Sequence, residues 1–226
     1  MQIGVVTGLA AEAGCLRQAG VVPASVRCTG ARPGAAAAAA EALIAGGCRG
    51  LVSFGTAGGL KPGMAPGTLV LATAAIMADG TRLAVDPAWH GRLWAGIQSL
   101  SPVTEAIAAL AEPLLDPAAK AACLRATGAA AVDMESGEVG RCAAAAGIPF
   151  LVVRAVADPA ERAIPPWVMQ AVTVDGRTRV RPVLAQIVRN PAVVPALVRL
   201  AGDARRAMRS LSRVAALAGP LLAFDR

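Results

Sequence analysis

The sequence contains no tyrosine, few other aromatic residues and a single histidine, His90. A serine–histidine–aspartate triad needs a histidine base and zinc sites commonly use several histidines, so neither kind of site is expected. The shortage of aromatic side chains also argues against the base-stacking surfaces that bind single-stranded nucleic acid. We therefore expect carboxylates to carry any acid–base chemistry, and we expect no metal site and no nucleic-acid partner.

Cysteine is scarce as well: there are five, an odd number, and none forms a C-x-x-C pair. This count argues against a disulfide framework and favours a reducing compartment. The N-terminus lacks the basic and long apolar regions of a signal peptide, and the most apolar late stretch, residues 182–200, is interrupted by prolines and arginines. We expect a cytoplasmic protein that is soluble or held peripherally at the inner membrane.

Charged residues make up only 16% of the 226 residues and hydrophobic ones 55%, which is enough apolar material for one large core. We expect a single domain over residues 1–226. The net charge of +7 is unevenly spread, because residues 177–226 hold ten arginines against two aspartates, a net of +8, and the preceding residues carry a net of −1. The positive charge therefore belongs to a basic C-terminal segment, residues 177–226, within that domain.

Residues 204–218 of this segment have apolar side chains at helical spacing, which predicts an amphipathic helix. One face of the helix carries an arginine stripe, made of Arg205, Arg206, Arg209 and Arg213. Two interpretations stay open: a surface helix with a solvated basic face, or a surface that docks on an anionic membrane or a lipid substrate.

Short apolar runs alternate with alanine-rich helical stretches, which is typical of an α/β fold. The predicted strands cover residues 3–7, 26–29, 51–54, 68–72, 130–133 and 150–156. The predicted helices begin near residue 9 and cover residues 34–45 and 135–146. The third strand is expected to end in a glycine-rich turn over residues 55–59, and the uninterrupted apolar strands indicate a sheet that is covered on both faces.

Polar residues follow several of these strands, and in open α/β sheets ligands bind at the carboxyl ends of the strands. Gly8 and Glu12 come after the first strand, and Thr56 comes after the third. Glu135 and Asp158 follow the last two predicted strands. Each also has an ordinary structural interpretation: a glutamate in the first turn of a helix, a tight glycine turn or an aspartate N-cap. Spacing alone leaves both interpretations open.

Taken in order, these segments resemble the nucleoside phosphorylase superfamily and, within it, the methylthioadenosine/S-adenosylhomocysteine nucleosidases. The resemblance is carried by residues 1–4 with Glu12, and by residues 55–60, 131–136 and 149–158. Residues 6–12 and 153–159, together with 131–136 and the arginine-rich tail, are similar to the hopanoid-associated phosphorylase group. The second resemblance extends over nearly the whole chain.

This resemblance implies a three-layer α/β/α fold around a mixed, barrel-like central sheet, and a homodimer or larger homo-oligomer. It implies cleavage of an N-ribosidic bond without a metal or an organic cofactor. For the hopanoid-associated group the substrate is the lipid adenosylhopane, which loses adenine to give ribosylhopane in hopanoid lipid biosynthesis. The alternative is an enzyme acting on soluble nucleosides, either a purine nucleoside phosphorylase or a methylthioadenosine/S-adenosylhomocysteine nucleosidase.

Carried over residue by residue, the resemblance implies two catalytic carboxylates. Asp158 would protonate N7 of adenine, and Glu12 would activate the attacking water. Glu135 would bind the ribose 2′- and 3′-hydroxyls, with Met134 packed against the sugar. Thr56 and the backbone around it would hold the nucleophile or the sugar. The implied substrate-binding residues are Gly8, Thr56, Ala57, Gly58, Met134 and Glu135.

The chain departs from the family pattern near the base and at the nucleophile. Ala157 stands where a serine commonly precedes the base-binding aspartate, and no aromatic residue lies near residues 126–127 to stack on the base. Glu12 lies where phosphorolytic members usually place a phosphate-binding arginine. This favours water over phosphate as the nucleophile, with phosphate, held by Arg32 or Arg49, as the alternative co-substrate.

Overall fold

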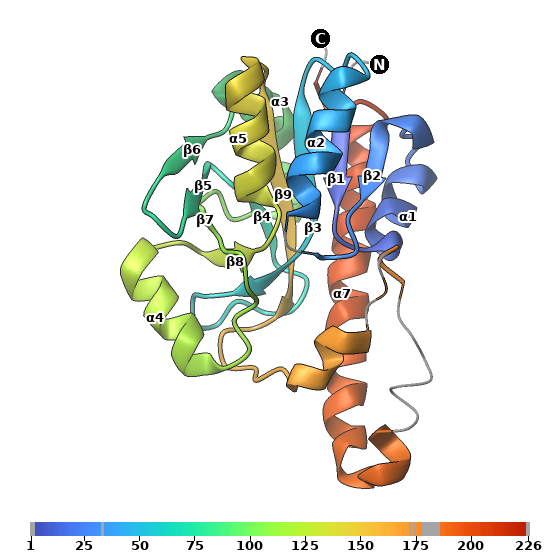
Figure 1. The fold of residues 1–226 in the computed structure, drawn as a ribbon, viewed down its shortest axis with the longest axis vertical. Coiled ribbons are helices and arrows are strands. Elements are labelled where there is room, and N and C mark those ends of the chain that lie inside the picture. The colour runs from blue at the N-terminus through green and yellow to red at the C-terminus, as the bar shows by residue number, and fades with distance from the viewer. Residues whose placement is uncertain (1–2, 33, 172, 174, 178–185, 225–226) are drawn as a thin grey trace.

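The computed structural model of the protein describes residues 3–32, 34–171, 173, 175–177 and 186–224. Within them, a nine-stranded mixed sheet lies between layers of helices (Figure 1). The strands are β1 (Gly4–Thr7), β2 (Val26–Cys28), β3 (Leu51–Gly59), β4 (Leu69–Leu71), β5 (Ala74–Met77), β6 (Arg82–Ala84), β7 (Ile107–Ala109), β8 (Ala131–Asp133) and β9 (Phe150–Asp158). The α-helices are α1 (Ala10–Gln18), α2 (Ala35–Ala45), α3 (Pro87–Ile97), α4 (Pro117–Thr127), α5 (Ser136–Ala146) and α7 (Val194–Ala218). Short 3₁₀ helices cover Pro23–Ser25, Gln98–Leu100, Pro166–Ala171 and Pro191–Val193.

The long parallel strands β3 and β9 form the centre of the sheet. The first part of β3 also pairs with β1, and its last two residues pair antiparallel with β8. The order across the sheet is β2-β1-β3-β8-β7-β5-β6, while β9 pairs with β3 and β4 pairs with β9. Because β3 has three neighbours, the sheet branches there, and the carboxyl ends of β1, β8 and β9 converge on the last part of β3.

Helices cover the sheet on both sides, as the uninterrupted apolar strands predict. Helices α2 and α5 pack against each other on one side, while α7 packs on β9 and contacts α1 and α3 (Figure 1). The first seven residues of β9 and the first five of β3 are buried, so the core runs on both faces of the central strands. The predicted three-layer α/β/α fold is confirmed.

The prediction of a glycine-rich turn over residues 55–59 is wrong, because these residues continue β3. The glycines instead allow side chains from other elements to come close to the backbone of β3. A Cβ atom on Gly55 would lie 2.6 Å from both Arg154 Nη1 and Glu12 Oε2, and one on Gly58 would lie 3.0 Å from Asp158 Oδ2. Glycine inside a strand commonly marks such an approach, and here it lets charged side chains pass over the strand.

Three short strands and two helices were not expected from the sequence. Strands β5, β6 and β7 are only three or four residues long, and half of their residues are alanine, so they carry almost no alternating pattern. The helices α3 and α4 do have a readable start, an aspartate N-cap followed by proline. Asp86 accepts from Trp89 N and Asp116 from Ala119 N, as N-cap side chains do.

Helix α7 is longer than the predicted helix over residues 204–218. Its second half buries Ala207, Leu211, Val214 and Ala215 in the core. Its first half extends beyond the end of the sheet, as Figure 1 shows. No helix in the described part of the chain is long and apolar enough to cross a membrane. Of the predicted basic segment, residues 178–185 and 225–226 lie outside the described residues.

Candidate functional site

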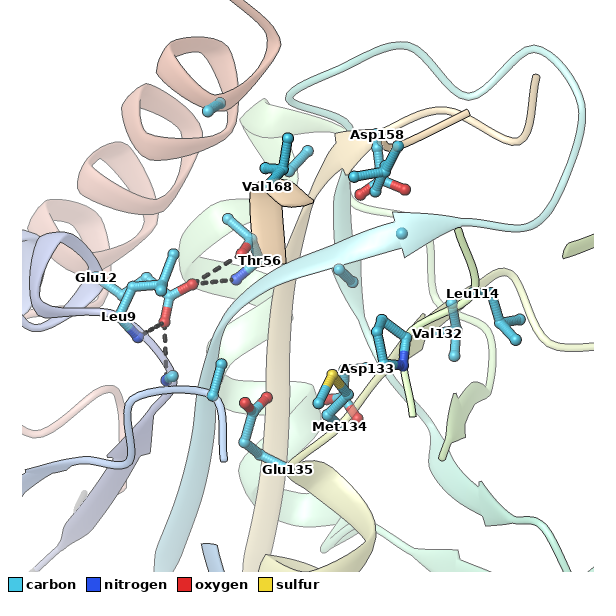
Figure 2. Close-up of a pocket in the computed structure, with 18 of the residues that line it drawn as sticks. Leu9, Glu12, Thr56, Leu114, Val132, Asp133, Met134, Glu135, Asp158 and Val168 are labelled. Carbon is cyan, nitrogen blue, oxygen red and sulfur yellow. Dashed lines mark hydrogen bonds between the residues drawn. The ribbon is translucent and has the colours of Figure 1, made fainter. Parts of the chain in front are cut away.

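A cavity of about 290 Å³ opens where the carboxyl ends of β1, β8 and β9 meet the last part of β3. All eight residues singled out from the sequence line this cavity, although they come from four separate segments of the chain. They are Gly8, Glu12, Thr56, Ala57, Gly58, Met134, Glu135 and Asp158. Figure 2 shows Glu12, Glu135 and Asp158 at separate places around the pocket. The fold brings the residues together, and their individual roles stay predictions.

Glu12 is buried in the first turn of α1 and accepts four hydrogen bonds (Figure 2). Its Oε2 accepts from the backbone N–H groups of Gly8 and Leu9, at 2.9 and 2.8 Å. Its Oε1 accepts from Thr56 N and Thr56 Oγ1, both at 2.8 Å. These four hydrogen bonds hold both oxygens of Glu12 in place. Glu12 is therefore both a helix-start residue and a pocket residue.

The donors around Glu12 make up a typical anion site: backbone N–H groups at a helix N-terminus, with a threonine N–H and hydroxyl facing them. In this chain the Glu12 carboxylate fills that site. A phosphate placed there would have to displace the carboxylate and would be repelled by it. Neither Arg32 nor Arg49 lines the cavity.

Glu135 lies just after β8, and a buried arginine donates a hydrogen bond to its carboxylate. Arg154 of β9 is fully buried and donates from Nη2 to Glu135 Oε2 at 3.2 Å and to Ser53 Oγ at 2.7 Å. Its Nε donates to Asp133 Oδ2 at 2.5 Å, and Asp133 Oδ1 accepts from Ser136 Oγ at 2.6 Å. Arg154 is thus a structural residue that pairs with both neighbouring carboxylates.

The environment of Glu135 disfavours its charged form. Burial raises the pKa of Glu135 to about 7; the Arg154 guanidinium opposes the rise, while the Asp133 and Glu12 carboxylates add to it. The second oxygen of Glu135 faces Gly8, since a Cβ atom there would lie only 2.9 Å from Oε1. One oxygen is held by Arg154 and the other borders the cavity, so the carboxylate can still accept hydrogen bonds from a ligand.

Asp158 ends β9 and is paired with a residue that sequence analysis missed. Lys120 of α4 is fully buried, and its Nζ donates to Asp158 Oδ2 at 2.5 Å. Burial raises the pKa of Asp158 to about 6, although the Lys120 ammonium lowers it. The only signal in the sequence was a lone lysine in an alanine-rich segment, which resembles an ordinary surface lysine.

Apart from Asp133 and the exposed Glu112, the remaining walls of the cavity are apolar. Among the described residues that line it there is no aromatic side chain, which agrees with the missing stacking residue. Two residues of α7 reach the cavity, so this helix forms part of the wall as well as part of the core. The apolar lining residues are Leu9, Pro113, Leu114, Val132, Met134, Ile164, Val168, Leu200 and Ala204, with Ala31, Ala57 and Ala157.

A mixed sheet that branches between two helix layers, with carboxylates gathered at its strand ends, defines the nucleoside phosphorylase type of α/β fold. The sequence model of the Phosphorylase superfamily matches residues 11–189, and the chain belongs to this family. Membership supports the expected class of enzyme, an N-glycosyl hydrolase or nucleoside phosphorylase. A comparison of the sequence with curated proteins finds no match.

Solved structures with the same fold include nucleosidases and a related hydrolase. The 5′-methylthioadenosine/S-adenosylhomocysteine nucleosidase of Neisseria meningitidis, in complex with methylthio-immucillin-A, has a TM-score of 0.72 at 16% identity, over 96% of this chain and 97% of that chain. Futalosine hydrolase of Helicobacter pylori has a TM-score of 0.71 at 14% identity, over 95% of both chains. The S-adenosylhomocysteine nucleosidase of Streptococcus pyogenes has a TM-score of 0.68 at 17% identity, over 96% of both chains.

Replacing Glu135 with glutamine tests the cost of its buried carboxylate. Between the ordinary pKa of 4.5 and about 7, the folded protein keeps a proton on Glu135 that the unfolded chain has lost, so stability falls as the pH rises through that window. Glu135→Gln removes this loss. We expect its free energy of unfolding at about pH 8 to exceed that of the wild type by on the order of 1–3 kcal/mol.

Urea unfolding at several pH values measures this difference. Near pH 4, where the wild-type side chain is also neutral, the two proteins should differ little (roughly 0.5 kcal/mol or less). A difference of equal size at both ends of the pH range would contradict the raised pKa of Glu135.

Proposed function

We propose that the protein cleaves the N-ribosidic bond of adenosylhopane, releases adenine and gives ribosylhopane, with water as the nucleophile. The observation that carries this proposal is the pocket, in which Glu12, Glu135 and Asp158 share one cavity with an apolar wall that continues onto α7. The similar solved structures, two of which are named as nucleosidases and one as a hydrolase, add support for cleavage at a ribosyl carbon.

The positions of the carboxylates match the charges that develop when a ribosyl–adenine bond breaks. Positive charge builds on the sugar and negative charge on the departing adenine. Glu135, in its ionised form, accepts from the ribose 2′- and 3′-hydroxyls and so places the sugar over Gly8. Asp158 lies at the other end of the cavity, where it gives a proton to N7 of the leaving base. A pKa of about 6 lets Asp158 hold that proton in a useful fraction of molecules near neutral pH.

Glu12 favours water over phosphate as the nucleophile. Its carboxylate occupies the donors of Gly8, Leu9 and Thr56 that would otherwise bind a phosphate. A water molecule that takes the place of the Thr56 hydroxyl on Oε1 can donate a hydrogen bond to the carboxylate and lose a proton to it as the sugar is attacked. The backbone N–H of Thr56 still fixes the rotation of the carboxylate, which orients that water.

The apolar lining favours a lipid substrate over a soluble nucleoside. A volume of about 290 Å³ is at the small end for ligand pockets, which commonly measure roughly 300–1,000 Å³. The nucleoside part of adenosylhopane fills such a space, so the fused-ring hydrocarbon must extend out of the cavity through its opening. Leu200 and Ala204 of α7, with Ile164 and Val168, give that hydrocarbon an apolar surface to lie on.

The same helix supplies a surface that can contact an anionic membrane, where such a lipid would be found. Val188 and Val198, near and within the projecting half of α7, are 81% and 66% exposed. Arg205, Arg209 and Arg213 are exposed further along the helix. Apolar residues that enter the interface and arginines that contact anionic headgroups together favour peripheral binding. The expected homo-oligomer and cytoplasmic location stay predictions.

Adenine release from adenosylhopane, followed by mass spectrometry with and without phosphate, tests the proposed function. We expect adenine and free ribosylhopane in the absence of phosphate. Methylthioadenosine and S-adenosylhomocysteine serve as competing substrates in the same assay. Strict dependence on phosphate with a sugar 1-phosphate product would contradict the role of Glu12, and cleavage of only the soluble nucleosides would contradict the lipid substrate.

Asp158→Asn and Glu12→Gln are each expected to lower kcat on the order of 10²-fold or more, because each removes the transferable proton or its acceptor and leaves the shape nearly unchanged. Glu105→Gln is the matched control, since Glu105 forms an exposed ion pair with Lys61. Near-normal turnover in either of the first two variants would remove that residue from the mechanism.

Replacing the arginine stripe with glutamine tests membrane binding in a vesicle flotation assay. The variant changes Arg205, Arg206, Arg209 and Arg213, and its control changes four exposed arginines elsewhere: Arg27, Arg82, Arg125 and Arg141. Each arginine near an anionic surface contributes about 1 kcal/mol, so the stripe variant should float far less than the control, which has the same net charge. Equal flotation of the two variants would contradict the proposed docking surface.

A further inference from the structure

Helix α4 packs on the protein through the partly buried Cys123 and Leu124, and also through a charged side chain. Lys120 is the one residue of this helix that is buried. Its Nζ donates to Asp158 Oδ2 at 2.5 Å, to Pro159 O at 2.9 Å and to Arg162 O at 3.1 Å. An ammonium group has three N–H donors, and these three acceptors can satisfy all of them.

A buried ammonium is costly, and α4 already has apolar contacts that hold it in place. Removing a charge from water costs several kcal/mol unless a partner charge and good hydrogen bonds offset it, and a leucine would dock the helix without that cost. The three acceptors all belong to the end of β9 and the loop that follows it, so Lys120 fixes the backbone that presents Asp158 as well as the carboxylate itself.

The contact leaves one oxygen of Asp158 available to a ligand. Oδ2 accepts from Lys120, whereas no described residue donates a hydrogen bond to Oδ1. The preceding residue, Ala157, has no polar side chain with which to orient the carboxylate. Asp158 lines the cavity with its side chain 14% exposed, while Lys120 is fully enclosed behind it.

We propose that Lys120 is a positioning residue for the N-ribosidic cleavage reaction: it holds Oδ2 of Asp158 from behind, so that Oδ1 faces the leaving base and carries the transferred proton. The inference rests on the proposed function for the role of Asp158. It does not require Lys120 to touch the substrate.

The charges that face Asp158 come from three elements. Lys120 belongs to α4, Asp203 to α7 and Arg162 to the loop after β9; Arg162 also pairs with Asp203, at 3.0 Å. Burial raises the pKa of Asp158, and Asp203 adds to the rise, while Lys120 and Arg162 lower it, with Lys120 the larger of the two. Without Lys120, less positive charge counteracts the effect of burial on Asp158. The pKa of Asp158 is therefore expected to move above its wild-type value of about 6.

Lys120→Met removes the ammonium but keeps the length of the side chain. We expect kcat for adenine release to fall about tenfold or more with little change in KM, because the acid loses its orientation and not its contact with the substrate. Carbon-13 NMR of the Asp158 carboxyl should show its pKa moving upward. The same substitution in an Asp158→Asn background should have almost no further effect on kcat.

Lys61→Met is the matched control, because Lys61 and Lys120 are the only lysines in the sequence and Lys61 lies in an exposed ion pair. It should change neither kcat nor the pKa of Asp158. An unchanged Asp158 pKa in Lys120→Met, or an equal loss of kcat with and without Asp158, would overturn the proposal and leave Lys120 as a residue needed only for folding.

A measurement on the wild type covers the case in which Lys120→Met does not fold. With two lysines, the ammonium signal of Lys120 can be assigned by its persistence in Lys61→Met. The chemical shift of this ammonium signal should change with pH, with the same midpoint as the carbon-13 titration of the Asp158 carboxyl. An ammonium chemical shift that stays constant through that titration would overturn the proposed pair. Should the wild type cleave neither adenosylhopane nor methylthioadenosine, the proposed function fails, while the two NMR titrations still decide whether Lys120 controls Asp158.

Discussion

The rest of the site depends on the ion pairs and hydrogen bonds of the buried Arg154 guanidinium. It lies at the centre of the sheet and joins β9 to Ser53 on β3, to Asp133 at the end of β8 and to Glu135 beyond it. Without its charge, the carboxylates of Asp133 and Glu135 would be left buried beside each other with no cation to offset their repulsion. Gly55 is required beside it, because any larger residue would meet the guanidinium.

The pocket is organised as two ion pairs separated by apolar side chains. Arg154 and Glu135 lie on the side assigned to the sugar, and Lys120 and Asp158 lie on the side assigned to the base. In both pairs the cation is fully buried and the carboxylate borders the cavity. Each carboxylate is therefore oriented from behind by a cation that a ligand cannot reach, and burial raises the pKa of each towards neutrality.

Sequence patterns predict the strands and the pocket residues well where they follow general rules. Glu12 and Asp158 reach one cavity because β1 and β9 run parallel to β3 and present their carboxyl ends on the same side. Glu135 reaches it from β8, which pairs antiparallel with the last two residues of β3. The glycines of β3 were misread as a turn, because a glycine that makes room for Arg154 looks the same in sequence as one that bends the chain. Lys120 was missed because its burial depends on contacts between α4 and a loop about forty residues away, which no local pattern encodes.

The way Glu12 fills the anion site also bears on the direction of the reaction. A phosphorylase keeps the energy of the broken bond in a sugar phosphate, so its reaction runs readily in both directions and responds to the supply of phosphate. An enzyme that holds its own carboxylate in that place forms a free sugar, which cannot recombine with adenine to any useful extent in water. In the proposed hydrolysis, Glu12 would therefore make the cleavage irreversible in practice and independent of the phosphate supply.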